Sequence, residues 1–243
     1  MANALNLHEL GDPDSRPLLA LHGVTGHGGQ WRRVAEHLSG YRITAPDLRG
    51  HGRSTAEPPW TLERHTADVL ALLGEPTGTV LVGFSFGGLV AARVAATAPD
   101  RIAALVLVDP AVEVDPAFAA DTANLTKTSA DLAAAREVQR HDWPEVPDDV
   151  LERELAENWV RVDGRWRTRA EPAAVLAAWQ EMLRPAVPPP SSVRTLVIRS
   201  LRSGIVPDSY LTGVTAVDLD CGHLIPQDRP AELAALIDGF VRG

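Results

Sequence analysis

Residues 80–88 have the sequence Val-Leu-Val-Gly-Phe-Ser-Phe-Gly-Gly, and the rest of the fold can be predicted outward from this stretch. The apolar run is typical of a strand in a parallel sheet that is covered on both faces. Gly83 and Gly87 flank Ser85, where a sharp reversal needs the room that a Cβ atom would occupy. An alanine-rich segment then predicts a helix from Phe86 to about Ala98. Ser85 is therefore expected at a tight turn between a strand and a helix.

A serine between glycines in this setting matches the G-x-S-x-G nucleophile elbow, and the chain resembles the α/β-hydrolase superfamily. The helix that follows points backbone N–H groups at the serine, where negative charge would be stabilised. The alternative is that Ser85 is an ordinary turn residue. The resemblance implies an α/β fold with a mostly parallel sheet, helices on both faces and an inserted helical cap.

Composition limits the classes of partner. The chain has 243 residues and a formal net charge of −9, whereas a nucleic-acid or anionic-membrane site needs clustered Lys and Arg. We therefore expect a small-molecule substrate, with no nucleic acid and no membrane as partner. Residues 1–10 carry no basic region and no long apolar run, so we expect neither a signal peptide nor an anchor, and a cytoplasmic location. A single cysteine, Cys221, excludes an internal disulfide and a cysteine-built zinc site.

A glycine-rich loop, residues 22–29 (His-Gly-Val-Thr-Gly-His-Gly-Gly), follows a short apolar strand at 18–21. It matches neither nucleotide-binding glycine pattern, so a nucleotide cofactor is not expected. A loop with His-Gly at this position lends one backbone N–H to the oxyanion hole in the α/β hydrolases. The resemblance therefore implies that Val24 supplies one N–H and Phe86, after the nucleophile, the other. The alternative is a loop without chemistry.

A second family-like segment, residues 46–54 (Pro-Asp-Leu-Arg-Gly-His-Gly-Arg-Ser), follows the strand predicted at 42–45. Asp47, His51 and Arg53 are residue types used in catalysis and metal binding. We favour a turn whose Asp and Arg side chains hydrogen-bond to neighbouring backbone groups over a catalytic or metal-binding role for these residues. No metal is expected.

Strands alternate with helices up to Asp109, which predicts βαβ units with active residues at the carboxyl ends of the strands. Residues 111–190 break this rhythm with helical patterns at 131–140, 148–160 and 171–183 and a hairpin at 160–167. We therefore predict a core of residues 1–110 and 191–243 and a cap of residues 111–190. The cap holds four of the six tryptophans. We expect them to pack the cap against the sheet, or one or two of them to line an apolar pocket.

A serine nucleophile needs a nearby base, since its hydroxyl is too weakly acidic to attack unaided. His223, after the last predicted strand (214–219), stands where the family carries its histidine. The alternative is a loop histidine bonded to backbone.

The acid of a Ser-His-Asp triad is not obvious. Most members of the family carry it in the loop after the strand predicted at 195–199, but residues 200–207 contain no carboxylate. Asp208 follows, where an Asp is a common helix cap. Asp109, which ends the strand after the elbow helix, is the acid that we favour, because some members carry it there. Asp109 as a turn residue before Pro110, and a site without any acid, remain as alternatives.

These residues predict a serine hydrolase that cleaves a small ester, lactone or related carbonyl substrate through an acyl-enzyme. Ser85 would attack, His223 would transfer the proton, and Asp109 would orient the histidine. No cofactor is required, and the oligomeric state is left open. The alternatives are a non-hydrolytic enzyme on the same fold (a lyase, C–C hydrolase, haloperoxidase-like enzyme or cyclase) and a weakly active ligand-binding member.

Overall fold

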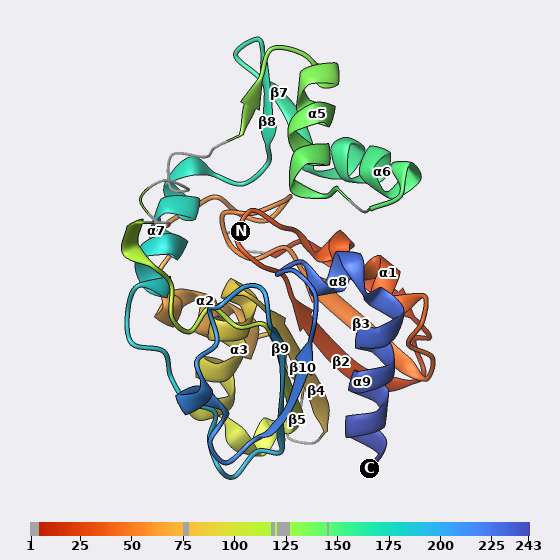
Figure 1. Ribbon diagram of the computed structural model, residues 1–243, viewed down its shortest axis with the longest axis vertical. Helices are drawn as coiled ribbons and strands as arrows, with labels where there is room; N and C mark the ends of the chain where they lie inside the picture. The colour runs from red at the N-terminus through yellow and green to blue at the C-terminus, as the bar shows by residue number, and fades with distance from the viewer. Residues whose placement is uncertain (1–4, 75–77, 118–119, 121–126, 145) are drawn as a thin grey trace.

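The computed structural model describes residues 5–74, 78–117, 120, 127–144 and 146–243. A seven-stranded sheet forms its centre, with the order β1-β3-β2-β4-β5-β9-β10 (Figure 1). Every neighbouring pair is parallel except β1 and β3 at one edge. The strands are β1 (Leu7–Gly11), β2 (Arg16–Leu21), β3 (Tyr41–Pro46), β4 (Thr79–Phe84), β5 (Ile102–Val108), β9 (Thr195–Ser200) and β10 (Thr215–Leu219).

Helices cover both faces of the sheet because the central strands are apolar on both sides. In β2, Leu19 and Leu21 belong to one buried cluster, whereas Leu18 and Ala20 belong to the other. The first cluster contains residues of α2 (Leu62–Leu70) and α3 (Phe86–Thr97), and the second contains residues of α1 (Arg32–Ala35), α8 (Ile225–Asp228) and α9 (Pro230–Arg242). Alternate side chains of a strand point to opposite faces, so this division confirms the predicted sheet with two covered faces.

Short 3₁₀ helices occupy three connections: Gly28–Trp31, Pro99–Arg101 and Asp208–Leu211. The first lies directly before α1. Helix α2 begins after Thr61, whose side chain accepts a hydrogen bond from the backbone N–H of Arg64 and caps the helix.

The segment between β5 and β9, called the cap below, lies over one end of the sheet (Figure 1). Ser85 directly follows β4. The cap contains α5 (Leu132–Asp142), α6 (Asp148–Asn158), α7 (Pro172–Met182) and a three-stranded sheet of β6 (Thr128–Ser129), β7 (Trp159–Val162) and β8 (Arg165–Thr168). The predicted hairpin is present: Asp163 and Gly164, both with positive φ, connect β7 to β8. Helix α6 ends at Asn158, two residues before the predicted end, because Trp159 begins β7. Residues 118–119, 121–126 and 145 of the predicted cap lie outside the described residues.

The tryptophans of this segment have different environments. Trp159 packs within the cap against Ala135 and Leu155, and Trp166 lies beside them. Trp179, on α7, packs against the main buried cluster on the α3 side of the sheet. Trp143 lines a cavity between the cap and the sheet. Trp179 therefore packs the cap against a face of the core as predicted, Trp143 lines a cavity, and Trp159 and Trp166 pack within the cap. Among the described residues, no helix has the length and the apolar composition that crossing a membrane requires.

Candidate active site

Ser85 lies at the turn between β4 and α3, as the sequence predicts. Its backbone has φ 53° and ψ −119°, a conformation that costs a residue with a side chain about 1–3 kcal/mol. The flanking glycines make the turn sterically feasible. A Cβ atom on Gly83 would lie 2.3 Å from the carbonyl oxygen of Gly87, and one on Gly87 would lie 2.5 Å from the carbonyl oxygens of Leu21 and His22. The chain holds a strained, buried serine at the carboxyl end of the central strand.

His223 reaches Ser85 from the loop after β10. Its Nε2 atom lies 3.0 Å from the Oγ atom of Ser85. The ring packs against Phe84, with 4.8 Å between the ring centroids. A neutral imidazole that carries its hydrogen on Nδ1 can accept the serine proton at Nε2. The imidazole and the hydroxyl are therefore within hydrogen-bond distance of each other.

Asp109 lies on the other side of the histidine. Its Oδ2 atom is 2.6 Å from Nδ1 of His223, and its Oδ1 atom accepts a hydrogen bond of 3.0 Å from the backbone N–H of Ser200. The side chain is completely buried, and the residue has φ 40°. Because both oxygens have a partner, the carboxylate is fixed in the orientation that holds a hydrogen on Nδ1 of His223.

Asp208, the other candidate acid, lies elsewhere. Its side chain is 93% exposed, and its Oδ1 atom accepts a hydrogen bond of 2.5 Å from Arg199. The loop after β9 is organised instead by the hydroxyl of Ser200, which accepts from the backbone N–H groups of Arg202 and Ser203 and donates to the carbonyl of Cys221. Of the two candidate acids, Asp109 is therefore the one hydrogen-bonded to His223, whereas Asp208 is bonded to Arg199.

Phe86 follows Ser85 in the chain, and Val24 follows Gly23, which lies close to the serine. Phe86 is the first residue of α3, and the first N–H groups of a helix have no partner within the helix. Val24 lies in a turn closed by a hydrogen bond of 3.1 Å from the N–H of Gly26 to the carbonyl of Gly23. A Cβ atom on Gly23 would lie 3.2 Å from the Cβ atom of Ser85, so this turn passes directly beside the serine.

A cap residue holds the same turn. Thr25 has φ 64°, and its carbonyl accepts a hydrogen bond of 3.2 Å from Nδ2 of Asn158, the last residue of α6. The same Nδ2 atom donates to Glu154 at 2.8 Å. Asn158 and Glu154 are both buried. The cap and the glycine-rich loop are therefore joined by hydrogen bonds that no local sequence pattern indicates.

A cavity of about 60 Å³ lies between this turn and the cap. Its walls include Gly23, Val24 and Phe84 from the core and Trp143 and Asn158 from the cap. Ser85 and His223 do not line it themselves, but their chain neighbours Phe84 and Leu224 do. The cavity is thus next to the serine and the histidine.

Comparison with known proteins places the chain in a family. The sequence model of the alpha/beta hydrolase fold matches residues 16–156, which is more than half of the chain. The protein is a member of the α/β-hydrolase family.

Lipase LipV of Mycobacterium tuberculosis is 37% identical to this α/β hydrolase over 250 residues, with 96% of each chain covered. The sn-1-specific diacylglycerol lipase of Danio rerio is 33% identical over 159 residues, which cover 62% of this chain and 46% of that protein. Among solved structures, E-2-(acetamidomethylene)succinate hydrolase matches with a TM-score of 0.83 at 21% identity, with 99% of this chain and 96% of that chain covered. The last likeness shows the fold alone.

In the loop after β3 of this α/β hydrolase, Asp47 has the hydrogen bonds to backbone groups that the sequence predicts. Asp47 accepts from the backbone N–H groups of Gly28 and Arg53, and Nδ1 of His51 bonds with the carbonyl of Arg49. Burial acts to raise the pKa of Asp47, but hydrogen bonds from His8 and from these N–H groups outweigh it and hold the pKa well below its usual value. Asp47 is therefore an ionised carboxylate that orders the loop.

His22 connects that loop to the glycine-rich loop. Its Nδ1 atom is 2.7 Å from the carbonyl of Gly23, and Nε2 accepts a hydrogen bond of 2.8 Å from the N–H of Leu48. Burial lowers the pKa of His22 to about 4, so the ring is neutral at neutral pH with its hydrogen on Nδ1. The sequence shows His22 as part of a His-Gly pair but does not show its two partners.

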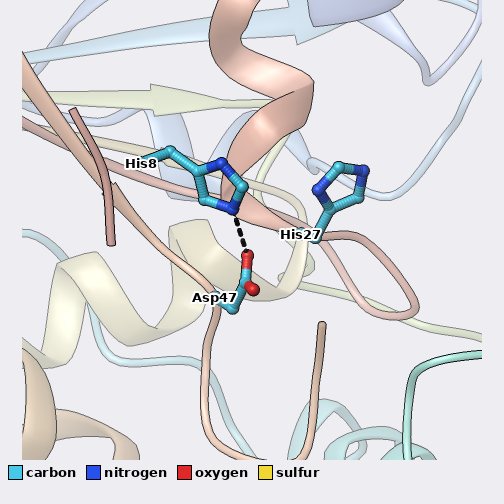
Figure 2. Close-up of side chains that lie close together, drawn as sticks. All are labelled: His8, His27 and Asp47. Atoms are coloured by element: carbon cyan, nitrogen blue, oxygen red, sulfur yellow. Dashed lines mark hydrogen bonds and ion pairs between the residues drawn. The ribbon is translucent and has the colours of Figure 1, made fainter. Parts of the chain in front are cut away.

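Among the described residues, one group has the composition of a metal site: His8, His27 and Asp47 (Figure 2). It lies outside the cluster of Ser85, His223 and Asp109.

Proposed function

We propose that the protein is a serine hydrolase that cleaves a small carboxylic ester, lactone or related carbonyl compound through an acyl-enzyme. The observation that carries this proposal is the hydrogen-bonded series Asp109–His223–Ser85. The distances are 2.6 Å from Oδ2 of Asp109 to Nδ1 of His223 and 3.0 Å from Nε2 of His223 to Oγ of Ser85. The similarity to LipV, which is named a lipase and is matched over 96% of its length, supports ester hydrolysis as the reaction class.

Acylation begins with Ser85. Its Oγ atom attacks the carbonyl carbon of the ester while its proton passes to Nε2 of His223. Asp109 keeps the hydrogen of the neutral ring on Nδ1 and stabilises the imidazolium that forms. The same imidazolium then gives its proton to the leaving alcohol as the C–O bond breaks, which leaves an ester on Ser85.

The negative charge on the tetrahedral intermediate meets the backbone N–H groups of Val24 and Phe86. Each such donor is worth a factor of about 10²–10³ in kcat in serine hydrolases. The Phe86 donor is supplied by the helix that the elbow begins. The position of the Val24 N–H depends on the turn at Thr25, which has a positive φ. Asn158 of the cap holds this turn by donating a hydrogen bond to the carbonyl of Thr25.

Deacylation uses the same groups with water as the nucleophile. His223 takes a proton from water at Nε2, the hydroxide adds to the acyl carbon, and the proton returns to Oγ of Ser85 as the acid leaves. No step needs a metal or an organic cofactor. The ligand-binding alternative depended on a missing acid, and the position of Asp109 supports turnover instead.

The cavity favours short substrates. A cavity of about 150 Å³ accommodates a benzene ring, whereas the cavity lined by Phe84 and Leu224, the chain neighbours of Ser85 and His223, has about 60 Å³. We therefore propose that the acyl or alcohol group on this side of the ester has a few carbon atoms. We also propose a cytoplasmic location, which the absence of a second cysteine for a disulfide supports.

The test is hydrolysis of p-nitrophenyl acetate, butyrate and laurate by the wild type and by Ser85→Ala and His223→Ala. We expect kcat/KM to fall from the short esters to laurate, and both variants to lose at least about 10⁴-fold activity. Wild-type-like turnover by Ser85→Ala would refute the proposed function. A preference for laurate would refute only the proposed size of the substrate.

A further inference from the structure

A second polar cluster lies at the sheet edge formed by β1 and β3. His8 of β1, His27 of the glycine-rich loop and Asp47 after β3 each place one atom of a metal-ligand type within 4.8 Å of the others (Figure 2). We propose that these three side chains bind one divalent transition-metal ion of the zinc class, with water as the fourth ligand. The proposed function does not use this cluster.

Asp47 offers a rigid ligand. Its Oδ2 atom accepts hydrogen bonds from Nδ2 of Asn6 at 2.9 Å and from the N–H of Arg53 at 2.8 Å. Its Oδ1 atom accepts from the N–H of Gly28 at 2.8 Å and lies 2.9 Å from Nε2 of His8. A carboxylate oxygen has two lone pairs, so Oδ1 keeps its bond to Gly28 while the second lone pair serves the metal. The ion takes the place of the hydrogen between His8 and Asp47.

His27 is oriented by a partner that metal sites commonly use. Its Nε2 atom lies 3.0 Å from Oε2 of Glu154, and both side chains are about 95% buried. This contact leaves Nδ1 as the free ring nitrogen, and Figure 2 shows a nitrogen of His27 facing His8 and Asp47. Ligating histidines usually give their other N–H to a carboxylate, which fixes the tautomer and strengthens the ligand. In this cluster, Glu154 is the carboxylate that accepts the N–H of His27.

His8 supplies the movement that binding requires. Zn–N and Zn–O distances of about 2.0–2.1 Å in a tetrahedral site correspond to about 3.3 Å between ligand atoms. Because the ligand atoms lie within 4.8 Å of one another, the widest separation must shorten by at most about 1.5 Å. His8 is on an edge strand, its side chain is 18% exposed, and its ring centroid is 5.8 Å from that of His27. A rotation of His8 toward His27 closes the site without moving the buried ligands.

The ligand set and the charge select the type of ion. Two imidazole nitrogens and one carboxylate suit Zn²⁺ and Co²⁺, whereas Mg²⁺ and Ca²⁺ prefer oxygen ligands. The carboxyl groups of Asp47 and Glu154 lie at the cluster, and each is hydrogen-bonded to one of its two histidines. Two carboxylates thus balance an ion of charge +2. The bound ion connects β1, both loops and, through Glu154, helix α6 of the cap.

The experiment uses full-length protein without a histidine tag, treated with EDTA and dialysed. Titration calorimetry with Zn²⁺ should give one saturable site per chain, and Co²⁺ should give the visible absorption of a tetrahedral complex, whereas Mg²⁺ should not bind. At a hundredfold excess of Zn²⁺ over Kd, Tm should rise by about 5–10 °C. Absence of saturable Zn²⁺ binding by the wild type overturns the proposal.

His8→Gln is the decisive variant, because a glutamine amide can still donate to Asp47 but is a poor metal ligand. We expect its affinity for Zn²⁺ to fall by at least about 100-fold and its ester hydrolysis to stay at the wild-type rate. His37→Gln, at an exposed histidine after α1, is the matched control and should bind as the wild type does. If His8→Gln binds Zn²⁺ like the wild type, or if His37→Gln loses binding, the ion is held elsewhere and the assignment is wrong.

Discussion

Replacing Asp109 by Asn is expected to reduce kcat by about 10⁴-fold while leaving the fold intact. The backbone N–H of Ser200 donates to Oδ1 at 3.0 Å and can only donate, so the carbonyl oxygen of the new amide must stay there. Its NH₂ group then faces Nδ1 of His223, which must accept. The ring hydrogen consequently moves to Nε2, where it blocks the transfer of the Ser85 proton.

The size of the effect follows from the tautomer. In serine proteases, an Asn in place of the Asp also puts the histidine in the wrong tautomer and lowers kcat by about 10⁴-fold. This factor corresponds to about 5.4 kcal/mol of transition-state stabilisation. Binding of substrate does not use Asp109, so KM should change by less than about threefold. Initial rates with p-nitrophenyl butyrate give both parameters, and thermal unfolding shows whether the isosteric variant is folded.

Asp208→Asn is the matched control, because Asp208 is the other candidate acid. It is exposed and paired with Arg199, so its kcat should stay within about twofold of the wild type. An Asp109→Asn variant that keeps more than a tenth of the wild-type kcat, or an Asp208→Asn variant that loses as much as Asp109→Asn, would refute the role given to Asp109.

Other predictions concern the elbow, the cap and a buried histidine. Gly87→Ala should destabilise the protein by at least about 2 kcal/mol in urea unfolding, because its Cβ atom would lie 2.5 Å from two carbonyl oxygens; an unchanged midpoint would contradict the geometry. Asn158→Ala removes the hydrogen bond to Thr25 and should lower kcat by about tenfold with little change in KM. Glu152→Ala on the same helix, where Glu152 bonds to Arg136, is the control and should leave kcat unchanged. Equal effects of the two substitutions would show that the contact with the glycine-rich loop does not matter for catalysis. Burial lowers the pKa of His65 to about 3, so only the unfolded chain binds its proton between pH 6.5 and 3, and wild-type stability decreases as pH falls through this range. His65→Phe should reduce that slope by up to about 1.4 kcal/mol per pH unit, and an unchanged slope in pH-dependent urea unfolding would count against a neutral His65.

The elements around Ser85 could be predicted because their signals are local. A buried strand, two glycines and an alanine-rich helix stand next to one another in residues 80–98, and the structure has β4, the turn and α3 there. The choice of His223 came from the resemblance, which places a histidine after the last strand. Parallel strands bring their carboxyl ends to one edge of the sheet, so this loop and the turn at Ser85 lie at the same edge.

The choice between Asp109 and Asp208 as the acid of the triad could not be settled from the sequence pattern. Strand β5 lies beside β9, and the N–H of Asp109 donates to the carbonyl of Ile198 at 2.7 Å. The ends of the two strands are therefore adjacent, and a carboxylate on either one can approach His223. Only the register of β5 against β9 shows which carboxylate approaches His223.

The hydrogen bonds between the cap and the glycine-rich loop could not be predicted from the sequence. His27 and Glu154 are 127 residues apart, and Asn158 and Thr25 are 133 residues apart. The bond from Ser200 to Asp109 uses a backbone N–H, which every residue except proline supplies, so no side chain indicates it.

The most direct test of the central claim is covalent labelling of the intact protein with a fluorophosphonate, followed by mass spectrometry of its peptides. We predict one phosphonyl group per chain, on Ser85, with labelling strongly slowed in His223→Ala. Labelling of another residue, or no labelling of a protein that still hydrolyses esters, would contradict a mechanism in which the hydroxyl of Ser85 is the nucleophile.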